Sequence, residues 1–320
     1  MGLGLSRRSL LTGVGSVAAA SVAGTLLDAT RATDGWSAVP SPTEKTLYDV
    51  AAASDATHAA GASGVVIRRG SDGWTVVLAD GPSGNSETLE GVDATDDGLR
   101  LWIVGASGRL GSYAVTDDTV RDRSAPGGFG GDLHDVAVVG PVGSERVYAA
   151  AGSGTLLVGT RATDGTFDWS VVDTDGTNAV TAVDFRTAEA DHAVTTGPGV
   201  FGTTDGGATW TAVTPADAAG RFFAVTSGSE VLRVGVDDGR IWRRDCECAL
   251  WTPLRAGSKA VRAVAERDGR LLGAGEGGRV FERRRDGWTA VDTPVGNVLL
   301  GALPGSTDVA VGNSGTILER

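Results

Sequence analysis

The sequence predicts an all-β fold, a single seven-bladed β-propeller of four-stranded blades, and three recurring features support this prediction. Short runs of Val, Leu, Ile and Phe are typical of β-strands. A Trp closes most units at intervals of about 40 residues, which is a typical length for a propeller blade. A Gly-rich turn separates the strands of each unit at residues 61–64, 105–108, 152–154, 197–199, 235–239, 275–278 and 312–315.

The Trp residues that close the units define the blades. One interval, between Trp74 and Trp169, is about twice as long as the others and therefore contains a blade without its Trp. A single indole supplies about 150–250 Å² of buried surface, so we expect each to pack between neighbouring blades. Trp102 and Trp242 lie inside predicted strands and are expected in the core. The six closing residues are Trp36, Trp74, Trp169, Trp210, Trp251 and Trp288.

The last unit has only three predicted strands, at residues 297–303, 308–311 and 316–319. The fourth is available at the other end of the chain, because residues 33–39 match residues 286–291, which end the preceding blade. The N-terminal strand would then complete the last blade and close the ring without leaving an edge strand. We therefore expect the propeller to span residues 32–320.

Residues 1–31 form a predicted targeting segment outside the propeller. Arg7 and Arg8 directly precede a weakly apolar run that ends near Leu27, and this pattern resembles the twin-arginine export signal. The resemblance implies export after folding, to the outside of the cell or the outer face of the cytoplasmic membrane. The segment is either cleaved or kept as a membrane anchor.

The composition restricts the partners. The chain carries a net charge of -12, and its only Lys residues are Lys45 and Lys259. An acidic, Lys-poor composition resembles that of haloarchaeal proteins, whose surfaces stay hydrated in brine. Because the excess of carboxylates repels phosphate backbones and anionic lipids, nucleic acid is excluded as a partner. We expect a monomer.

No cofactor or metal is expected from the sequence. Cys246 and Cys248 are the only cysteines, and three His residues lie in different blades. Two thiolates at this spacing supply at most half of a zinc or copper site. A local disulfide outside the cytosol and a pair of free thiols are the remaining alternatives.

Two motifs resemble known repeats. Residues 203–210 fit the Asp-box, or bacterial neuraminidase repeat, through Thr203, Asp205, Gly207 and Trp210. In that motif the Asp caps its own hairpin turn, so the resemblance implies a structural role. Residues 310–318 resemble the repeat of the photosystem II assembly factor family, whose seven-bladed propellers are binding scaffolds without an active site. The resemblance covers the mature chain at the level of the repeat and implies the fold and a scaffold role.

Sialidases also carry Asp-boxes, so we considered catalysis. They use an arginine trio, a Tyr nucleophile with a Glu partner and an Asp acid, whereas the three Tyr residues here lie beside no matching Glu. The residues His58, His134 and His192 are dispersed along the chain, which disfavours a catalytic triad or a metal cluster. A glycan-active hydrolase or lyase of the sialidase-like type is the alternative to a binding protein.

Two surfaces are candidate binding sites. Alignment of the first strands places seven chemically different side chains at equivalent positions near one mouth of the central channel, while their neighbours repeat. A heterogeneous ring of this kind is typical of a binding site, although unconstrained drift beside a loop gives the same pattern. The ring consists of Tyr48, Glu90, His134, Thr181, Phe223, Arg262 and Leu300.

Arginines recur on the opposite face, just before the turn between third and fourth strands. This basic rim would suit an acidic partner or an envelope glycan. Local ion pairs with Asp72, Asp164, Asp245 and Asp286, which follow closely, would instead neutralise it and contribute only about 0–1 kcal/mol each. The rim contains Arg68, Arg69, Arg161, Arg243, Arg244, Arg283, Arg284 and Arg285.

The sequence therefore favours an exported, non-catalytic propeller that binds a protein or a surface glycan through one of its faces. The fold alone does not choose the face or the ligand.

Overall fold

The computed structural model describes residues 35–320, except 175, 229, 246 and 286. In these residues, 28 strands form seven antiparallel sheets of four. Each sheet is one blade, and blades 1 to 7 are numbered in chain order. Arg7 and Arg8 of the expected export signal lie outside the described residues.

The first four blades contain sixteen consecutive strands. Blade 1 has β2 (Leu47–Ala52), β3 (Thr57–Gly61), β4 (Val66–Gly70) and β5 (Gly73–Leu78). Blade 2 has β6 (Leu89–Ala94), β7 (Arg100–Gly105), β8 (Arg109–Ala114) and β9 (Thr119–Asp122). Blade 3 has β10 (Leu133–Val139), β11 (Arg146–Ala151), β12 (Thr155–Arg161) and β13 (Phe167–Asp173). Blade 4 has β14 (Val180–Phe185), β15 (Asp191–Thr195), β16 (Val200–Thr203) and β17 (Thr211–Ala212).

The remaining three blades include the closing strand. Blade 5 has β18 (Phe222–Ser227), β19 (Val231–Val236), β20 (Arg240–Asp245) and β21 (Trp251–Arg255). Blade 6 has β22 (Val261–Arg267), β23 (Arg270–Gly275), β24 (Val280–Arg284) and β25 (Gly287–Val291). Blade 7 has β26 (Leu299–Leu303), β27 (Val309–Gly312), β28 (Ile317–Glu319) and β1 (Ser37–Ala38).

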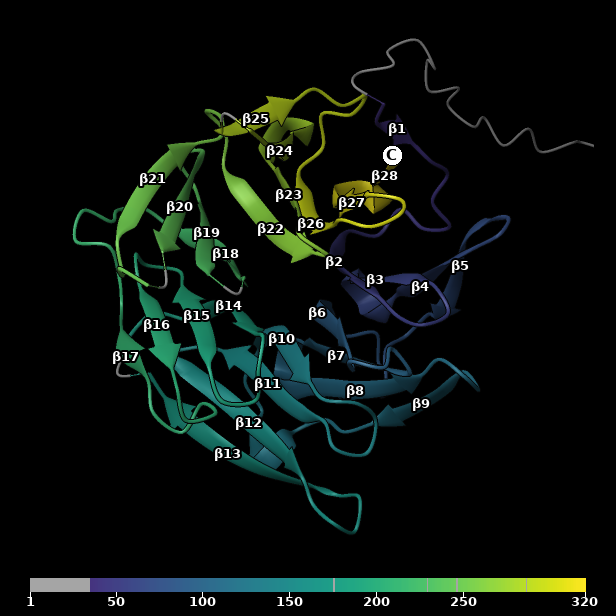
Figure 1. Cartoon of the computed structure of the whole chain (residues 1–320). Helices are drawn as coiled ribbons and strands as arrows, with labels where there is room; N and C mark the ends of the chain where they lie inside the picture. Colours follow the sequence, from purple (N-terminus) through teal and green to yellow (C-terminus); the bar gives the residue numbers. More distant parts are fainter. Residues whose placement is uncertain (1–34, 175, 229, 246, 286) are drawn as a thin grey trace, which may run out of the picture. The chain divides into compact units, whose positions relative to one another are not determined.

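The first strands of the blades surround the centre of the propeller (Figure 1). Each first strand contacts that of the next blade, and β26 contacts β2, so the ring is closed. This arrangement confirms the predicted seven-bladed propeller. Within the described residues, no helix is long and apolar enough to cross a membrane.

The closing strand pairs as predicted. Ser37 pairs with Glu319 and Ala38 with Leu318, and the Val39 N–H donates to the Ile317 carbonyl at 3.1 Å. The adjacent Trp36 is buried against blade 6, where its indole N–H donates to Glu282 Oε1 at 3.3 Å. The N-terminal strand therefore supplies both the last hydrogen-bonded edge of blade 7 and part of its boundary with blade 6.

Gly-rich turns fix how the second and third strands of a blade connect. The backbone at Gly315 has a φ of +67°, and a Cβ there would lie 1.9 Å from the Thr43 carbonyl oxygen. A Cβ at Gly312 would lie 2.1 Å from the Val298 carbonyl oxygen. Only glycine fits such close approaches to backbone, because any side chain would overlap with it. The repeated glycines thus hold the turn against the chain that enters the first strand.

Apolar clusters between neighbouring blades form the core. All six closing Trp residues pack in such clusters, each with the preceding blade, as predicted; for example, Trp74 packs against Val309 and Ile317 of blade 7. Blade 2 is the blade that lacks its Trp. There Tyr113 is buried and Val120 packs against the cluster between blades 1 and 2. Trp102 and Trp242 are buried in their strands, also as predicted.

Candidate functional site: the central channel

A backbone irregularity explains the ring of different side chains at the channel mouth. In every first strand the pairing shifts by one residue after the first position, so that Leu47 pairs with Gly61 but Asp49 pairs with Ala60. The extra residue of such a β-bulge is free of the ladder and its side chain is re-aimed. The seven bulge residues are Tyr48, Glu90, His134, Thr181, Phe223, Arg262 and Leu300.

All seven bulge residues line one cavity of about 970 Å³ in the centre of the propeller. The structure therefore brings together every residue that the strand alignment placed at the mouth. Their role in binding remains a prediction.

An ion pair joins two blades at this mouth. The Nδ1 atom of His134 lies 2.9 Å from Glu90 Oε2, and both side chains are partly exposed to the cavity. The hydrogen bond to Glu90 raises the pKa of His134. The pair thus places a charged, titratable group at the mouth of the cavity.

A cation and an aromatic ring form the opposite part of the mouth. The Arg262 guanidinium lies 4.0 Å from the centre of the Phe223 ring and donates to Glu276 Oε1 at 2.6 Å. Its buried Nε has no hydrogen-bond partner among the described residues. A stacked, partly exposed guanidinium of this kind retains donors for an incoming carboxylate or carbonyl.

The Thr181 hydroxyl, unlike the charged groups of the mouth, bonds to the backbone. It donates to the Phe222 carbonyl at 3.0 Å and lies 3.3 Å from the Val194 carbonyl. Thr181 therefore connects blades 4 and 5, and its oxygen is less available to a ligand than the charged groups of the mouth.

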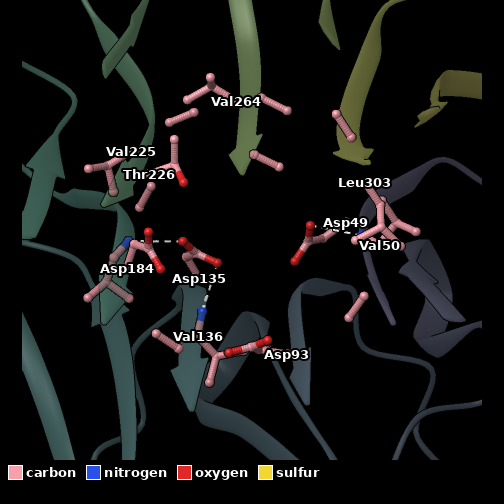
Figure 2. A pocket seen from close by; sticks show the side chains of 18 of the residues that line it. Asp49, Val50, Asp93, Asp135, Val136, Asp184, Val225, Thr226, Val264 and Leu303 are labelled. Carbon is pink, nitrogen blue, oxygen red and sulfur yellow. Dashed lines mark hydrogen bonds between the residues drawn. The ribbon is translucent and has the colours of Figure 1, made fainter. Parts of the chain in front are cut away.

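Four aspartates line the same cavity deeper in the channel, and the sequence analysis missed them. Figure 2 shows the carboxylates of Asp49, Asp135 and Asp184 around the open centre of the channel. In the sequence, the feature that marks these residues is an Asp at the third or fifth position of a first strand. This feature was missed because alternating strand positions are commonly polar when one side of the strand faces solvent. The four are Asp49, Asp93, Asp135 and Asp184.

Each of these carboxylates links two blades. Asp49 accepts N–H groups from Val50 in its own strand and from Val92 in blade 2, at 2.8 and 2.9 Å. Asp93 and Asp135 repeat this arrangement toward blades 3 and 4. The carboxylate of Asp184 accepts the Ser227 N–H of blade 5 at 2.6 Å. In the first three, one oxygen therefore bonds within its own strand and the other bonds to the next blade.

The channel raises the pKa values of these acids. Burial raises the pKa of Asp49 to about 6 and that of Asp184 to about 7. It raises the pKa of Asp93 to about 8, with a further contribution from the charges of Asp184 and Asp49. Burial and the Asp49 charge raise the pKa of Asp135 well above its usual value. Near neutral pH the ring therefore carries less charge than four free carboxylates would.

The basic rim is largely neutralised, mostly by residues other than those expected from the sequence. Arg243 pairs with Asp245 at 3.5 Å, as expected, but Arg69 pairs with Glu319 of blade 7 at 2.8 Å. The expected acid Asp164 instead accepts hydrogen bonds from the backbone and hydroxyl of Thr166. Asp286 lies outside the described residues. Further ion pairs join Arg68 to Asp118, Arg161 to Glu145 and Arg284 to Glu282.

The motif at residues 203–210 forms a local hydrogen-bonded turn. Asp205 accepts the Thr209 N–H at 2.9 Å and the hydroxyls of Thr209 and Thr203 at 2.6 and 2.9 Å. The Trp210 indole N–H donates to the Gly207 carbonyl at 3.2 Å. These contacts give Asp205 a structural role in the turn; assignment to the Asp-box rests on the sequence resemblance.

The cysteines and the potential metal ligands were compared with the structure within the described residues. Cys248 is exposed, and its N–H donates to Asp245 Oδ1 at 3.3 Å. Cys246 lies outside the described residues, so the structure does not decide between a local disulfide and a pair of free thiols. Within the described part of the chain, no three His, Cys, Asp or Glu side chains are grouped closely enough to hold a metal ion.

Blades 4 and 5 bring a Ser, a His and an Asp together, which the sequence did not indicate. Ser227 Oγ lies 3.3 Å and Asp191 Oδ1 lies 3.5 Å from His192. Both contacts are to the same ring nitrogen, Nδ1. A catalytic triad needs the two on opposite nitrogens, so that one orients the ring while the other is deprotonated. This arrangement is therefore not a triad.

Comparisons with known proteins extend the fold result. No family model and no curated protein sequence matches the chain. Among solved structures, YCF48 from Cyanidioschyzon merolae has a TM-score of 0.69 at 16% identity, covering 89% of this chain and 98% of that one. A structure of YCF48 bound to D1 peptide gives the same TM-score and identity, with coverages of 89% and 94%. A chain from the mitotic checkpoint complex has a TM-score of 0.72 at 14% identity, covering 99% of both chains. At these identities the likeness shows the propeller fold alone.

Proposed function

We propose that this protein is an exported, non-catalytic scaffold that binds a protein partner or a surface glycan through the mouth of its central channel. The observation that carries the proposal is the ring of bulge residues. All seven blades repeat the same bulge, yet each places a different side chain on one cavity. A repeating frame with a varied rim is the arrangement that a specific binding surface needs.

The chemistry of the mouth supports a ligand that carries both charged and apolar groups. The Glu90–His134 pair supplies charge, and Arg262 stacked on Phe223 supplies both a flat apolar face and hydrogen-bond donors. Aromatic and Arg side chains are the types that most often dominate binding energy at protein interfaces. Among the structural neighbours, YCF48 is described with a bound D1 peptide and another propeller belongs to a checkpoint complex. These neighbours support a protein partner over a glycan.

A paired recovery experiment tests the site. The mature protein is used to recover partners from envelope extract, in parallel with a His134→Ala, Phe223→Ala double variant. A matched Arg283→Ala, Arg285→Ala variant changes exposed rim residues that form no ion pair in the described structure. We expect the mouth variant to lose a partner that the rim variant retains, with both variants unfolding at the wild-type midpoint. Loss with the rim variant alone would refute the mouth as the site.

The alternative function is a glycan-active hydrolase or lyase. Screening against glycosides and polysaccharides tests it directly. Turnover that is abolished by Asp93→Asn, in a folded variant, would replace the scaffold proposal with a hydrolase that uses the channel carboxylates.

Export is the second part of the proposal, and the twin-arginine resemblance of residues 1–31 supports it. Replacement of Arg7 and Arg8 by Lys should trap the precursor in the cytoplasm. Appearance of the double variant outside the cell at the wild-type level would refute this route.

A further inference from the structure

A second cavity, of about 330 Å³, lies between blades 4 and 5. It shares only Arg186, Ser227 and Gly228 with the central channel. Ser227 ends the strand whose second residue is Phe223 at the mouth, so the two sites lie at opposite ends of that strand. The volume falls at the lower end of the range typical of small-molecule sites.

A shortened blade creates this cavity. The fourth strand of blade 4, β17, has two residues, whereas β13 in the preceding blade has seven. In addition, Gly202 faces His192 across the sheet, and a Cβ at Gly202 would lie 3.4 Å from the imidazole ring. The glycine therefore leaves that side of the ring uncovered.

The imidazole of His192 is held in place through its Nδ1 atom, which lies against Ser227 Oγ and Asp191 Oδ1. Asp191 is itself buried, and its second carboxylate oxygen accepts the backbone N–H of Arg186. The described chain provides no hydrogen-bond partner for His192 Nε2. A fixed ring with one unused nitrogen is suited to bind a ligand.

Two arginines add positive charge around the cavity. Arg186 and Arg244 both line the cavity, and within the described residues neither side chain forms an ion pair. In contrast, the neighbouring Arg243 pairs with Asp245. Thr204 and Thr211 also line this wall, together with Thr209, whose hydroxyl donates to Asp205. The lining residues thus include two cationic side chains and one carboxylate, that of Asp191. This local excess of positive charge contrasts with the net charge of -12 of the whole chain.

We propose that this cavity binds a small anionic ligand, whose carboxylate or phosphate group is held by Arg186 and Arg244 and whose remaining polar atoms contact His192 and the threonines. Guanidinium groups bind both anions through paired, charge-assisted hydrogen bonds. The site is separate from the channel mouth and does not depend on the function proposed for it.

Thermal unfolding and calorimetric titration with inorganic phosphate and with glucuronate test this site, at an ionic strength held constant with chloride. Binding to the folded state raises the unfolding midpoint. We expect one probe to give a saturable rise and a measurable Kd; a response to glucuronate alone identifies an acidic sugar, and a response to phosphate alone identifies a phosphate ligand.

Variants locate the binding. Arg186→Gln and Arg244→Gln should each weaken binding about tenfold or more, since hydrogen bonds to charged groups contribute about 1.5–3 kcal/mol. The matched control is Arg283→Gln, an exposed arginine of blade 6 that lines neither cavity, and it should bind as the wild type does. The proposal is overturned if neither probe binds saturably, or if both cavity variants bind with the wild-type Kd. A His134→Ala, Phe223→Ala variant should keep full affinity, which separates this result from that for the mouth.

Discussion

The carboxylate of Asp135 in blade 3 accepts the backbone N–H of Val183 in blade 4 at 2.9 Å. Its other oxygen accepts the N–H of Val136 in its own strand at 2.8 Å. Equivalent carboxylates lie at two alternating levels of the channel, at the third residue of β2 and β10 and at the fifth residue of β6 and β14. Together they join blades 1 to 5 around the channel.

Replacement of this carboxylate should destabilise the propeller. Asp135→Ala leaves the N–H groups of Val136 and Val183 without their acceptor in a partly buried site. An unsatisfied buried donor costs about 1–3 kcal/mol. We expect a loss of that order in the free energy of unfolding, measured with urea. Asp217→Ala is the control, because Asp217 is exposed and its side chain forms no hydrogen bond or ion pair with the described residues. An equal effect of the two changes would contradict the linking role.

The raised pKa of Asp93 predicts a dependence of stability on pH. Burial and two neighbouring charges raise this pKa to about 8, whereas an Asp in an unfolded chain titrates near 4. Between these values the folded state binds more protons than the unfolded state. The free energy of unfolding should therefore fall as the pH rises through this window. The contribution is fully present below about pH 4 and is lost above the folded pKa.

The variant Asp93→Asn isolates this effect, because an amide stays neutral at every pH. It should show a shallower fall in the free energy of unfolding between pH 5 and pH 8 than the wild type, measured in the same urea series. The absolute stability of the variant is not the readout, since the amide also loses one acceptor. A slope as steep as that of the wild type would contradict the raised pKa.

Loss of the closing strand should open the ring. Deletion through Val39 removes the partner of β28 and leaves Leu318 and its neighbours on an exposed edge. We expect a large loss of stability and a tendency to aggregate. Deletion of residues 1–31 alone is the matched control and should leave the unfolding midpoint unchanged. A milder change, Trp36→Ala, should cost about 3–5 kcal/mol, because that indole is fully buried.

The sequence predicted features that repeat along the chain and missed side-chain contacts between blades. Gly turns and closing Trp residues recur at a fixed period, so the blades, the Trp positions and the closing strand followed from local pattern. The mouth ring followed from alignment of equivalent positions. The partner of Arg69, however, is Glu319, which is 250 residues away and becomes a neighbour only when blade 7 meets blade 1. The aspartates that link the blades were missed because polar residues are common at alternating strand positions, and nothing in the sequence shows that each bonds to the next blade.

Glu145 provides the final prediction. This side chain is 1% exposed and lies between Arg100 of blade 2 and Arg161 of blade 3, with its second oxygen accepting the Gly143 N–H at 2.6 Å. The nearby Arg123 has a lowered pKa, caused first by its burial and then by the charges of the other arginines. One carboxylate therefore compensates a group of cations at this boundary between blades.

Glu145→Gln should leave these guanidinium groups facing one another across a neutral amide. Removal of one partner from a buried ion pair costs about 3–5 kcal/mol, because the remaining charge is desolvated without compensation. The loss in the free energy of unfolding should be larger at low salt than at high salt, since part of the repulsion among the arginines is screened. The control Glu44→Gln, at an exposed position, should change the stability little at either salt concentration. If Glu145→Gln behaved like this control, the carboxylate would not be needed to hold the arginines at this boundary.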